Sequence, residues 1–195
     1  MSHFTYIGIM IEKDKITRNW LRRYTGTDPN SFGQRILLTN FQNYVEKFAR
    51  KFDVPSNGLS GTMTSSTYSR GLVIINSGIG RSNGAIIMDL LPSVKPKCVF
   101  FLGKCGGLKK TTELGHFILP VAAIRGEGTS DDYLPKEVPA MPSFKLHKYM
   151  SQILVEQKIE YRTGVVYTTN RRVWEHDNKF KDYLRKIRVL GIDME

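Results

Sequence analysis

The 195-residue sequence contains only two cysteines, Cys98 and Cys105. Two thiols cannot form a disulfide framework or a four-thiolate metal site. The sequence also lacks any apolar run of the roughly 18 residues that a membrane-spanning helix needs. Its first residues, MSHFTYIGIMIEKDK, have neither the basic region nor the small-residue cleavage site of a secretory signal. We therefore expect a cytoplasmic protein that does not enter a membrane.

Repeats, low-complexity segments and blocks of like charge are also lacking. The composition, 41% apolar and 24% charged, is that of an ordinary globular chain, and the length fits one domain. The net charge is +11, but the basic residues are spread along the chain without a run of five or six. No zinc-finger spacing appears, and the aromatic residues do not cluster with basic ones as in RNA-binding sheets. Nucleic acid binding therefore rests on charge alone and is not favoured.

Short apolar segments alternate with helical patterns along the chain. This alternation predicts an α/β fold with a mostly parallel central sheet that helices cover on both faces. One strand candidate contains Pro120, which indicates an edge strand or a bulge. The expected strands are residues 35–39, 72–76, 98–102, 116–124, 164–168 and 189–194, with a further strand and turn in 61–71, and the expected helices are 41–51, 83–91, 144–158 and 175–187.

Glycine turns follow two of the expected strands. Parallel sheets bind ligands beyond the carboxyl ends of their strands, often at such turns. Neither turn is a nucleotide fingerprint, because SGIGRSNG lacks the Lys-Ser/Thr of a P-loop and the G-x-G-x-x-G spacing. The expected strand ends carry Ser77-Gly78, Gly103-Lys104, 168–170 and 193–195.

Four motifs occur in a fixed order: INSGIGRSNGA, FLGKCGGLKKTTELGHFILPVAAIRGEGTSDDYLP, VVYTTNRRVWE and GIDME. This set resembles the nucleoside phosphorylase/nucleosidase superfamily. Within it, ITRNWLRRYTG, ILLTNFQNYVEKFA and IRGEGTSDDYLP look most like bacterial AMP nucleosidases. The resemblance implies one three-layer α/β/α catalytic domain over residues 1–195, with residues 1–34 as an N-terminal arm. It also implies a homo-oligomer built from dimers, with a hexamer as one form.

The resemblance assigns roles to residues of this chain. Glu195 matches the family glutamate that holds the ribose hydroxyls, and Met194 the methionine that packs on the sugar. A carboxylate also stabilises the positive charge that develops on the ribosyl ring as the glycosidic bond breaks. Met194, on an apolar strand, could instead belong to the core. The same holds for Trp174, which we expect at the start of a helix. The resemblance places Ser77, Gly78, Gly103 and Lys104 near the sugar and phosphate, and Thr169, Asn170, Val173 and Trp174 near the base. No metal or other cofactor is implied.

Two phosphate-binding motifs of the superfamily's phosphorylases are missing. Those enzymes present G-D-P-x-R after the first strand and R-x-G-[ST] at the second turn, whereas this chain reads TNFQN at 39–43 and FLGK at 101–104. Asn43 and Phe101 stand where the arginines that hold inorganic phosphate are expected. A phosphate dianion without charged donors is poorly bound in a desolvated pocket. The sequence therefore favours hydrolysis by water over phosphorolysis.

Relatives continue past the M-E pair into a helix, a strand and a further helix. That part carries the aspartate that protonates the purine leaving group. We therefore expect a chain truncated at its C-terminus, with the general acid beyond residue 195.

The resemblance implies hydrolysis of AMP to adenine and ribose 5-phosphate, a reaction of purine salvage. The alternatives are a nucleoside phosphorylase or thioadenosine nucleosidase of the same fold, or a non-catalytic nucleotide-binding subunit. For the 5′-phosphate, Lys104 is the first candidate ligand and Arg125 the second, although Arg125 could simply pair with Glu127, Asp131 or Asp132. Further cations are Arg171 and Arg172, and Arg18, Arg22 and Arg23 on the N-terminal arm.

Overall fold

The computed structural model describes residues 3–58 and 63–194, and gives the backbone alone for residues 3–11. The chain divides into two compact units, Met1–Gly103 and Lys104–Glu195, and each is described here by itself. The prediction of a single catalytic domain over residues 1–195 stays a prediction. No described helix is long and apolar enough to cross a membrane.

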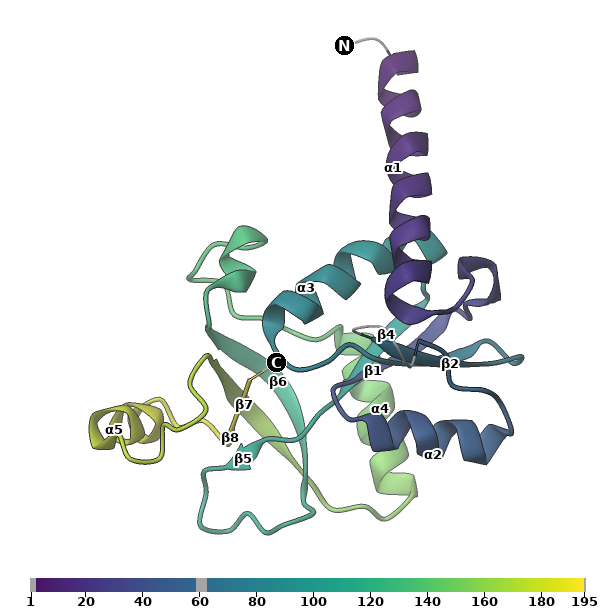
Figure 1. The fold of residues 1–195 in the computed structure, drawn as a ribbon. Helices are drawn as coiled ribbons and strands as arrows, with labels where there is room; N and C mark the ends of the chain where they lie inside the picture. The colour runs from purple at the N-terminus through teal and green to yellow at the C-terminus, as the bar shows by residue number, and fades with distance from the viewer. Residues whose placement is uncertain (1–2, 59–62, 195) are drawn as a thin grey trace. The chain divides into compact units, whose positions relative to one another are not determined.

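The first unit is built on a four-stranded sheet with the order β2-β3-β1-β4. Strand β1 pairs in parallel with β3 and with β4, and β2 is antiparallel to β3. Figure 1 shows α1 and α3 on one side of this sheet and α2 on the other. Its elements are α1 (His3–Thr25), η1 (Pro29–Ser31), β1 (Arg35–Thr39), α2 (Gln42–Phe52), β2 (Thr64–Tyr68), β3 (Leu72–Asn76), α3 (Arg81–Leu90), η2 (Leu91–Val94) and β4 (Cys98–Leu102).

An apolar cluster between the sheet and α1 and α3 forms the core of the first unit. Leu21 on α1 and Ile75 on β3 are both completely buried. Arg18 fixes α1 to the short helices, because its guanidinium donates to the Ser93 carbonyl at 2.8 Å and to Asn30 Oδ1 at 2.6 Å. The N-terminal arm of the sequence is therefore an α-helix whose last turns belong to the core. The buried members of the cluster are Leu21, Ile36, Leu38, Met63, Val73, Ile75, Ile87, Leu90 and Leu91.

The second unit has a four-stranded sheet with the order β5-β8-β7-β6. Strand β7 pairs in parallel with β6 and β8, while the short β5 is antiparallel to β8. Strand β6 lies at the edge, and its register shifts between Pro120 and Ala122, so the proline marks both an edge and a bulge. The elements are β5 (Gly106–Gly107), β6 (Phe117–Gly126), η3 (Thr129–Asp132), α4 (Phe144–Glu156), β7 (Tyr161–Thr169), α5 (Asn178–Lys186) and β8 (Gly191–Asp193).

The predicted α/β class with mostly parallel strands is confirmed, and the differences concern element ends. Helix α3 begins at Arg81, two residues earlier than expected, because Gly80 turns the chain with a φ of 101°. Helix α5 begins at Asn178 rather than 175, because the Asp177 side chain caps it by accepting the Phe180 N–H. The turn 103–107 contains the short strand β5.

Candidate active site

The carboxyl ends of three strands meet at one edge of the first unit. The Ser77 N–H donates to the Thr39 carbonyl at 2.9 Å, and Thr39 Oγ1 donates to the Leu102 carbonyl at 2.9 Å. Ser77 and Thr39 are both buried. These bonds join the ends of β3, β1 and β4, so the predicted residues Ser77, Gly78 and Gly103 share this edge.

The glycine turn after β3 is a backbone structure that leads directly into a helix. Asn76 Oδ1 accepts the Gly78 N–H at 2.9 Å, and Gly78 has a φ of 81°, in the left-handed region that favours glycine. Helix α3 starts three residues later. The first N–H groups of a helix have no partner within it and attract negative charge. The turn therefore suits the binding of a polar or anionic part of a ligand.

Phe101 covers the second glycine turn. A Cβ on Gly103 would lie 2.5 Å from the Phe101 ring, so a larger residue here would require the ring to move. The ring is about half exposed (47%). Asn43, at the other position of a missing arginine, is exposed on α2. A neutral aromatic ring and a neutral amide thus occupy the two positions at which the resemblance leads us to expect arginines in a phosphorylase.

A second set of strand ends meets within the second unit. Arg125 on β6 is opposite Thr168 on β7, and Thr168 is opposite Asp193 on β8. Thr169, Asn170 and Met194 follow these positions, so they share an edge with Arg125. Strand β5 runs antiparallel to β8, with Gly106 opposite Ile192, which brings the preceding Lys104 to the same edge.

Arg125 holds the loop that follows its own strand. Its side chain is 4% exposed, and its terminal nitrogens donate to the carbonyls of Ser130 (2.8 Å), Leu134 (3.1 and 3.2 Å) and Pro135. It also forms an ion pair with Asp131 at 3.7 Å. The pairing expected as the alternative to phosphate binding is therefore formed, with Asp131, and loop carbonyls take up most of its donors.

Glu127 and Asn170 connect this loop to the end of β7. The Glu127 carboxylate accepts the N–H groups of Thr129 at 2.7 Å and Ser130 at 3.2 Å. Asn170 Nδ2 donates to the Glu127 carbonyl at 2.5 Å. Sequence reasoning named Glu127 only as a partner for Arg125. The capping role of Glu127 could have been predicted from its position two residues before Thr129, because a carboxylate there can accept the first N–H groups of the following turn.

Trp174 lies in the loop before α5 and does not open a helix, which corrects the sequence expectation. The helix starts only at Asn178, after its aspartate cap. The indole is half-buried and packs on Phe180, with ring centroids 6.2 Å apart, against the cluster around Leu184. Its neighbour Val173 is 68% exposed. Trp174 therefore contributes to the core of the second unit, and Val173 lies on its surface.

An ion pair braces the same loop. Arg171 donates to Asp177 at 2.8 Å, and its guanidinium carbon lies 5.1 Å from the centroid of the Phe180 ring. The Phe180 N–H and then Arg171 hold the pKa of Asp177 below its usual range.

Burial, and next the nearby Tyr183, raise the pKa of Tyr167. The Tyr167 hydroxyl lies where a Cβ on Gly126 would be, so this tyrosine also fixes the end of β6.

The remaining candidates differ in exposure. Lys104 is exposed, Met194 is half-buried, and Thr169 is 2% exposed at the end of β7. Arg172 is exposed and pairs with Glu175 at 3.6 Å. Glu195 lies outside the described residues. Within residues 3–58 and 63–194, no three His, Cys, Asp or Glu side chains cluster in a way that could hold a metal ion.

Comparison with known proteins places these residues in context. Residues 34–195 match the family described as the phosphorylase superfamily. AMP nucleosidase of Escherichia coli K12 is 29% identical over 199 residues, which cover 80% of this chain and 41% of that protein. Uridine phosphorylase of Treponema pallidum is 25% identical over 157 residues, which cover 78% of this chain and 61% of that protein. The chain thus spans less than half of the E. coli protein.

Solved structures show the same likeness. The crystal structure of AMP nucleosidase from Bacteroides thetaiotaomicron has a TM-score of 0.88 and 51% identity, covering 94% of this chain and 77% of that one. Uridine phosphorylase from Vibrio fischeri has a TM-score of 0.79 and 25% identity, covering 87% and 72%.

Proposed function

Since the chain belongs to the phosphorylase superfamily, we propose that it hydrolyses the N-glycosidic bond of AMP to adenine and ribose 5-phosphate. The observation that carries this proposal is the 51% identity to the B. thetaiotaomicron AMP nucleosidase over 94% of the chain. In this reaction the bond between C1′ of the ribose and the adenine nitrogen breaks. Adenine leaves with the electron pair and takes one proton, and water supplies the hydroxyl group to C1′.

Water rather than inorganic phosphate is the proposed nucleophile. Phe101 and Asn43 are neutral, and Phe101 lies directly against Gly103. A desolvated phosphate dianion needs charged hydrogen-bond donors, which these two positions do not supply. This argument separates the chain from the uridine phosphorylases to which it is also similar.

Glu195 and Met194 are proposed to bind the ribose. The Glu195 carboxylate would accept the two ribose hydroxyls and stabilise the positive charge on the ribosyl ring in the transition state. Met194, half-buried after β8, would pack on the sugar. Thr169, Asn170 and Val173, at or after the end of β7, would contact the base.

Lys104 is proposed as the ligand of the 5′-phosphate. It is exposed and lies in the turn that leads into β5, at the carboxyl edge of the second sheet. Arg125 is the weaker candidate, because carbonyl groups of residues 130–135 accept from both of its terminal nitrogens. We further propose a cytoplasmic homo-oligomer built from dimers, as the resemblance implies.

The assay that tests the function compares AMP, adenosine, and adenosine with inorganic phosphate, with adenine and sugar products separated by chromatography. We expect adenine and ribose 5-phosphate from AMP, and no acceleration by phosphate. Ribose 1-phosphate or ribose 1,5-bisphosphate as the main product would show a phosphorylase. AMP binding without release of adenine would favour the non-catalytic nucleotide-binding subunit.

A further inference from the structure

A network of side-chain hydrogen bonds connects α2 and β2 of the first unit to the glycine turn after β3. Thr64 Oγ1 on β2 and Asn76 Nδ2 at the end of β3 both donate to Gln42 Oε1 at the start of α2, the second over 3.2 Å. Asn76 Oδ1 in turn accepts the Gly78 N–H at 2.9 Å. All four residues are half-buried. These four residues, called here the Gln42 network, thus join three elements to one turn of the candidate active site.

The pairing of donors with acceptors fixes the direction of both side-chain amides in this network. The Gly78 N–H can only donate, so the Asn76 oxygen faces it and the Asn76 amino group faces Gln42. That amino group can also only donate, so Gln42 presents its oxygen to it. A reversed Asn76 amide would bring two donors together at Gly78 and two acceptors together at Gln42. One arrangement of the amides therefore satisfies all of these bonds.

The glycine turn depends on this network because backbone bonds fix only its first residue. The Ser77 N–H donates to the Thr39 carbonyl, which ties the start of the turn to β1. The N–H of the next residue, Gly78, has the Asn76 side chain as its acceptor instead. An asparagine that accepts the N–H two residues later is a turn-forming contact in its own right. If the Asn76 amide could rotate, Gly78 would lose this acceptor, so Gln42 helps to hold the turn in place.

We propose that Gln42 is a positioning residue for AMP hydrolysis, an inference that rests on the proposed function. Gln42 fixes the Asn76 amide and, through it, the backbone of Gly78, beside which the sugar and phosphate of the substrate bind. Gln42 belongs to the segment TNFQN, where the resemblance leads us to expect the G-D-P-x-R motif in a phosphorylase. This segment thus supplies a neutral group that orders the turn. A small displacement of a group that positions the substrate is enough to lower the rate of the reaction.

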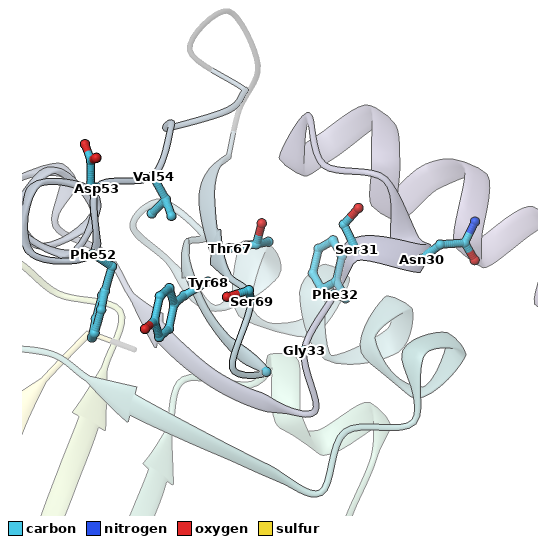
Figure 2. Close-up of a pocket in the computed structure, with 11 residues that line it drawn as sticks. Asn30, Ser31, Phe32, Gly33, Phe52, Asp53, Val54, Thr67, Tyr68 and Ser69 are labelled. Atoms are coloured by element: carbon cyan, nitrogen blue, oxygen red, sulfur yellow. The ribbon is translucent and has the colours of Figure 1, made fainter.

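The opposite ends of the same parallel strands offer a matched control. A pocket of about 700 Å³ opens there, beside Gly33 and Gly71, which lie shortly before β1 and β3. Figure 2 shows Thr67 among the residues that line this pocket. Thr67 lies on β2 three residues after Thr64, is half-buried like it, and is not a member of the Gln42 network. The same substitution at the two threonines therefore distinguishes an effect on the network from an effect on the strand.

Hydrogen exchange of the Gly78 amide, followed by NMR on the full chain, tests the network without AMP. In the parent we expect this amide to exchange at least tenfold more slowly than in an unstructured peptide. Gln42→Met keeps the length of the side chain and removes the amide acceptor, so exchange should become about fivefold faster. Gln42→Glu keeps an acceptor oxygen and should restore the protection. Thr64→Val should have a smaller effect in the same direction as Gln42→Met, and Thr67→Val should have none.

Steady-state kinetics then tests the effect on the proposed reaction. Well below the unfolding temperature of each variant, Gln42→Met should lower kcat/KM for AMP about tenfold, whereas a merely structural role would lower only the unfolding temperature. Thr64→Val keeps the branched shape of a strand residue and gives the same test, with a smaller loss, if Gln42→Met does not fold. An unprotected Gly78 amide in the parent, or faster exchange in Gln42→Met with the kcat/KM of the parent, would overturn the proposal and leave AMP hydrolysis standing. A parent that releases no adenine from AMP would overturn the proposed function, and the positioning role with it.

Discussion

The two units fix their structures by different means. In the first, Val73, Ile74 and Ile75 of β3 are buried in succession, and a large apolar cluster joins the sheet to α1 and α3. In the second, the fully buried cluster is Leu184, Val189 and Ile192, and the strand ends are held largely by side chains that donate to carbonyls. The difference teaches that apolar burial secures the first unit, whereas polar contacts secure the loops of the second. Three candidate substrate residues, Asn170, Val173 and Trp174, lie on the loop between β7 and α5.

The largest effect is expected from removing apolar volume in the first unit. Ile75→Ala empties a completely buried site at the centre of its cluster and should lower the free energy of unfolding by about 4 kcal/mol. Leu184→Ala, in the smaller cluster of the second unit, should cost about 2–3 kcal/mol, because partly exposed neighbours can relax around it. Denaturant titration measures both. Val155→Ala, at an exposed position of α4, is the control, and an equal or reversed order would contradict the comparison.

The next largest effect is expected on the rate of AMP hydrolysis, from a change at Glu195. Glu195→Gln keeps the shape of the side chain and removes its charge, so kcat for AMP should fall by about 10²-fold while KM changes little. Steady-state kinetics measures both constants. The exposed Glu137→Gln should leave them unchanged. Equal losses in kcat and in binding would mean that Glu195 only positions the substrate.

Substitution of Lys104 should change substrate preference, whereas substitution of Arg125 should change protein stability. Lys104→Ala should reduce the preference for AMP over adenosine by about 1.5–3 kcal/mol in kcat/KM, because the 5′-phosphate loses a cation. Arg125→Ala should instead lower stability by about 1–3 kcal/mol, since the carbonyls of the following loop lose a buried charged donor, and keep the preference. Lys110→Ala is the matched control. An unchanged preference in both Lys104→Ala and Arg125→Ala would direct attention to the arginines of the N-terminal arm.

Local sequence patterns predicted the regular elements well. The bounds of β1 and β4 agree with the expected 35–39 and 98–102, because polar residues on both sides of a short apolar run mark where the strand begins and ends. Pro120 correctly indicated both an edge and a bulge. The start of α5 was misplaced although Asp177, a favourable cap, stands directly before it. As a result Trp174 was expected on a helix and lies in a loop.

Contacts that depend on the path of a loop were not predictable in the same way. The edge that carries Ser77 and Gly103 follows from strand order alone, so the sequence could place it. The partners of Arg125 are backbone carbonyls, which every residue offers, so no side-chain pattern identifies them. The pocket beside Gly33 likewise arises where two loops pack, and its residues are scattered from 30 to 71.

The smallest effect is expected from the cap of α5, and it should depend on pH. The pKa of Asp177 is lowered by the Phe180 N–H and by Arg171, so its contribution to stability is present above the pKa of the unfolded state. It should disappear as the pH falls through the lower pKa of the folded state. Asp177→Asn keeps a capping oxygen and removes the charge, so its stability should differ little from that of the parent at low pH and be lower at neutral pH. Asp177→Ala removes both and should be the less stable variant throughout. Thermal unfolding of the three proteins between pH 2 and pH 7 measures this, with Asp182→Asn, an exposed carboxylate on α5, as the control. If the stability of Asp177→Asn and of the parent depended on pH in the same way, the charge of Asp177 would not stabilise the second unit. That result would contradict the claim that polar contacts secure the loops of this unit.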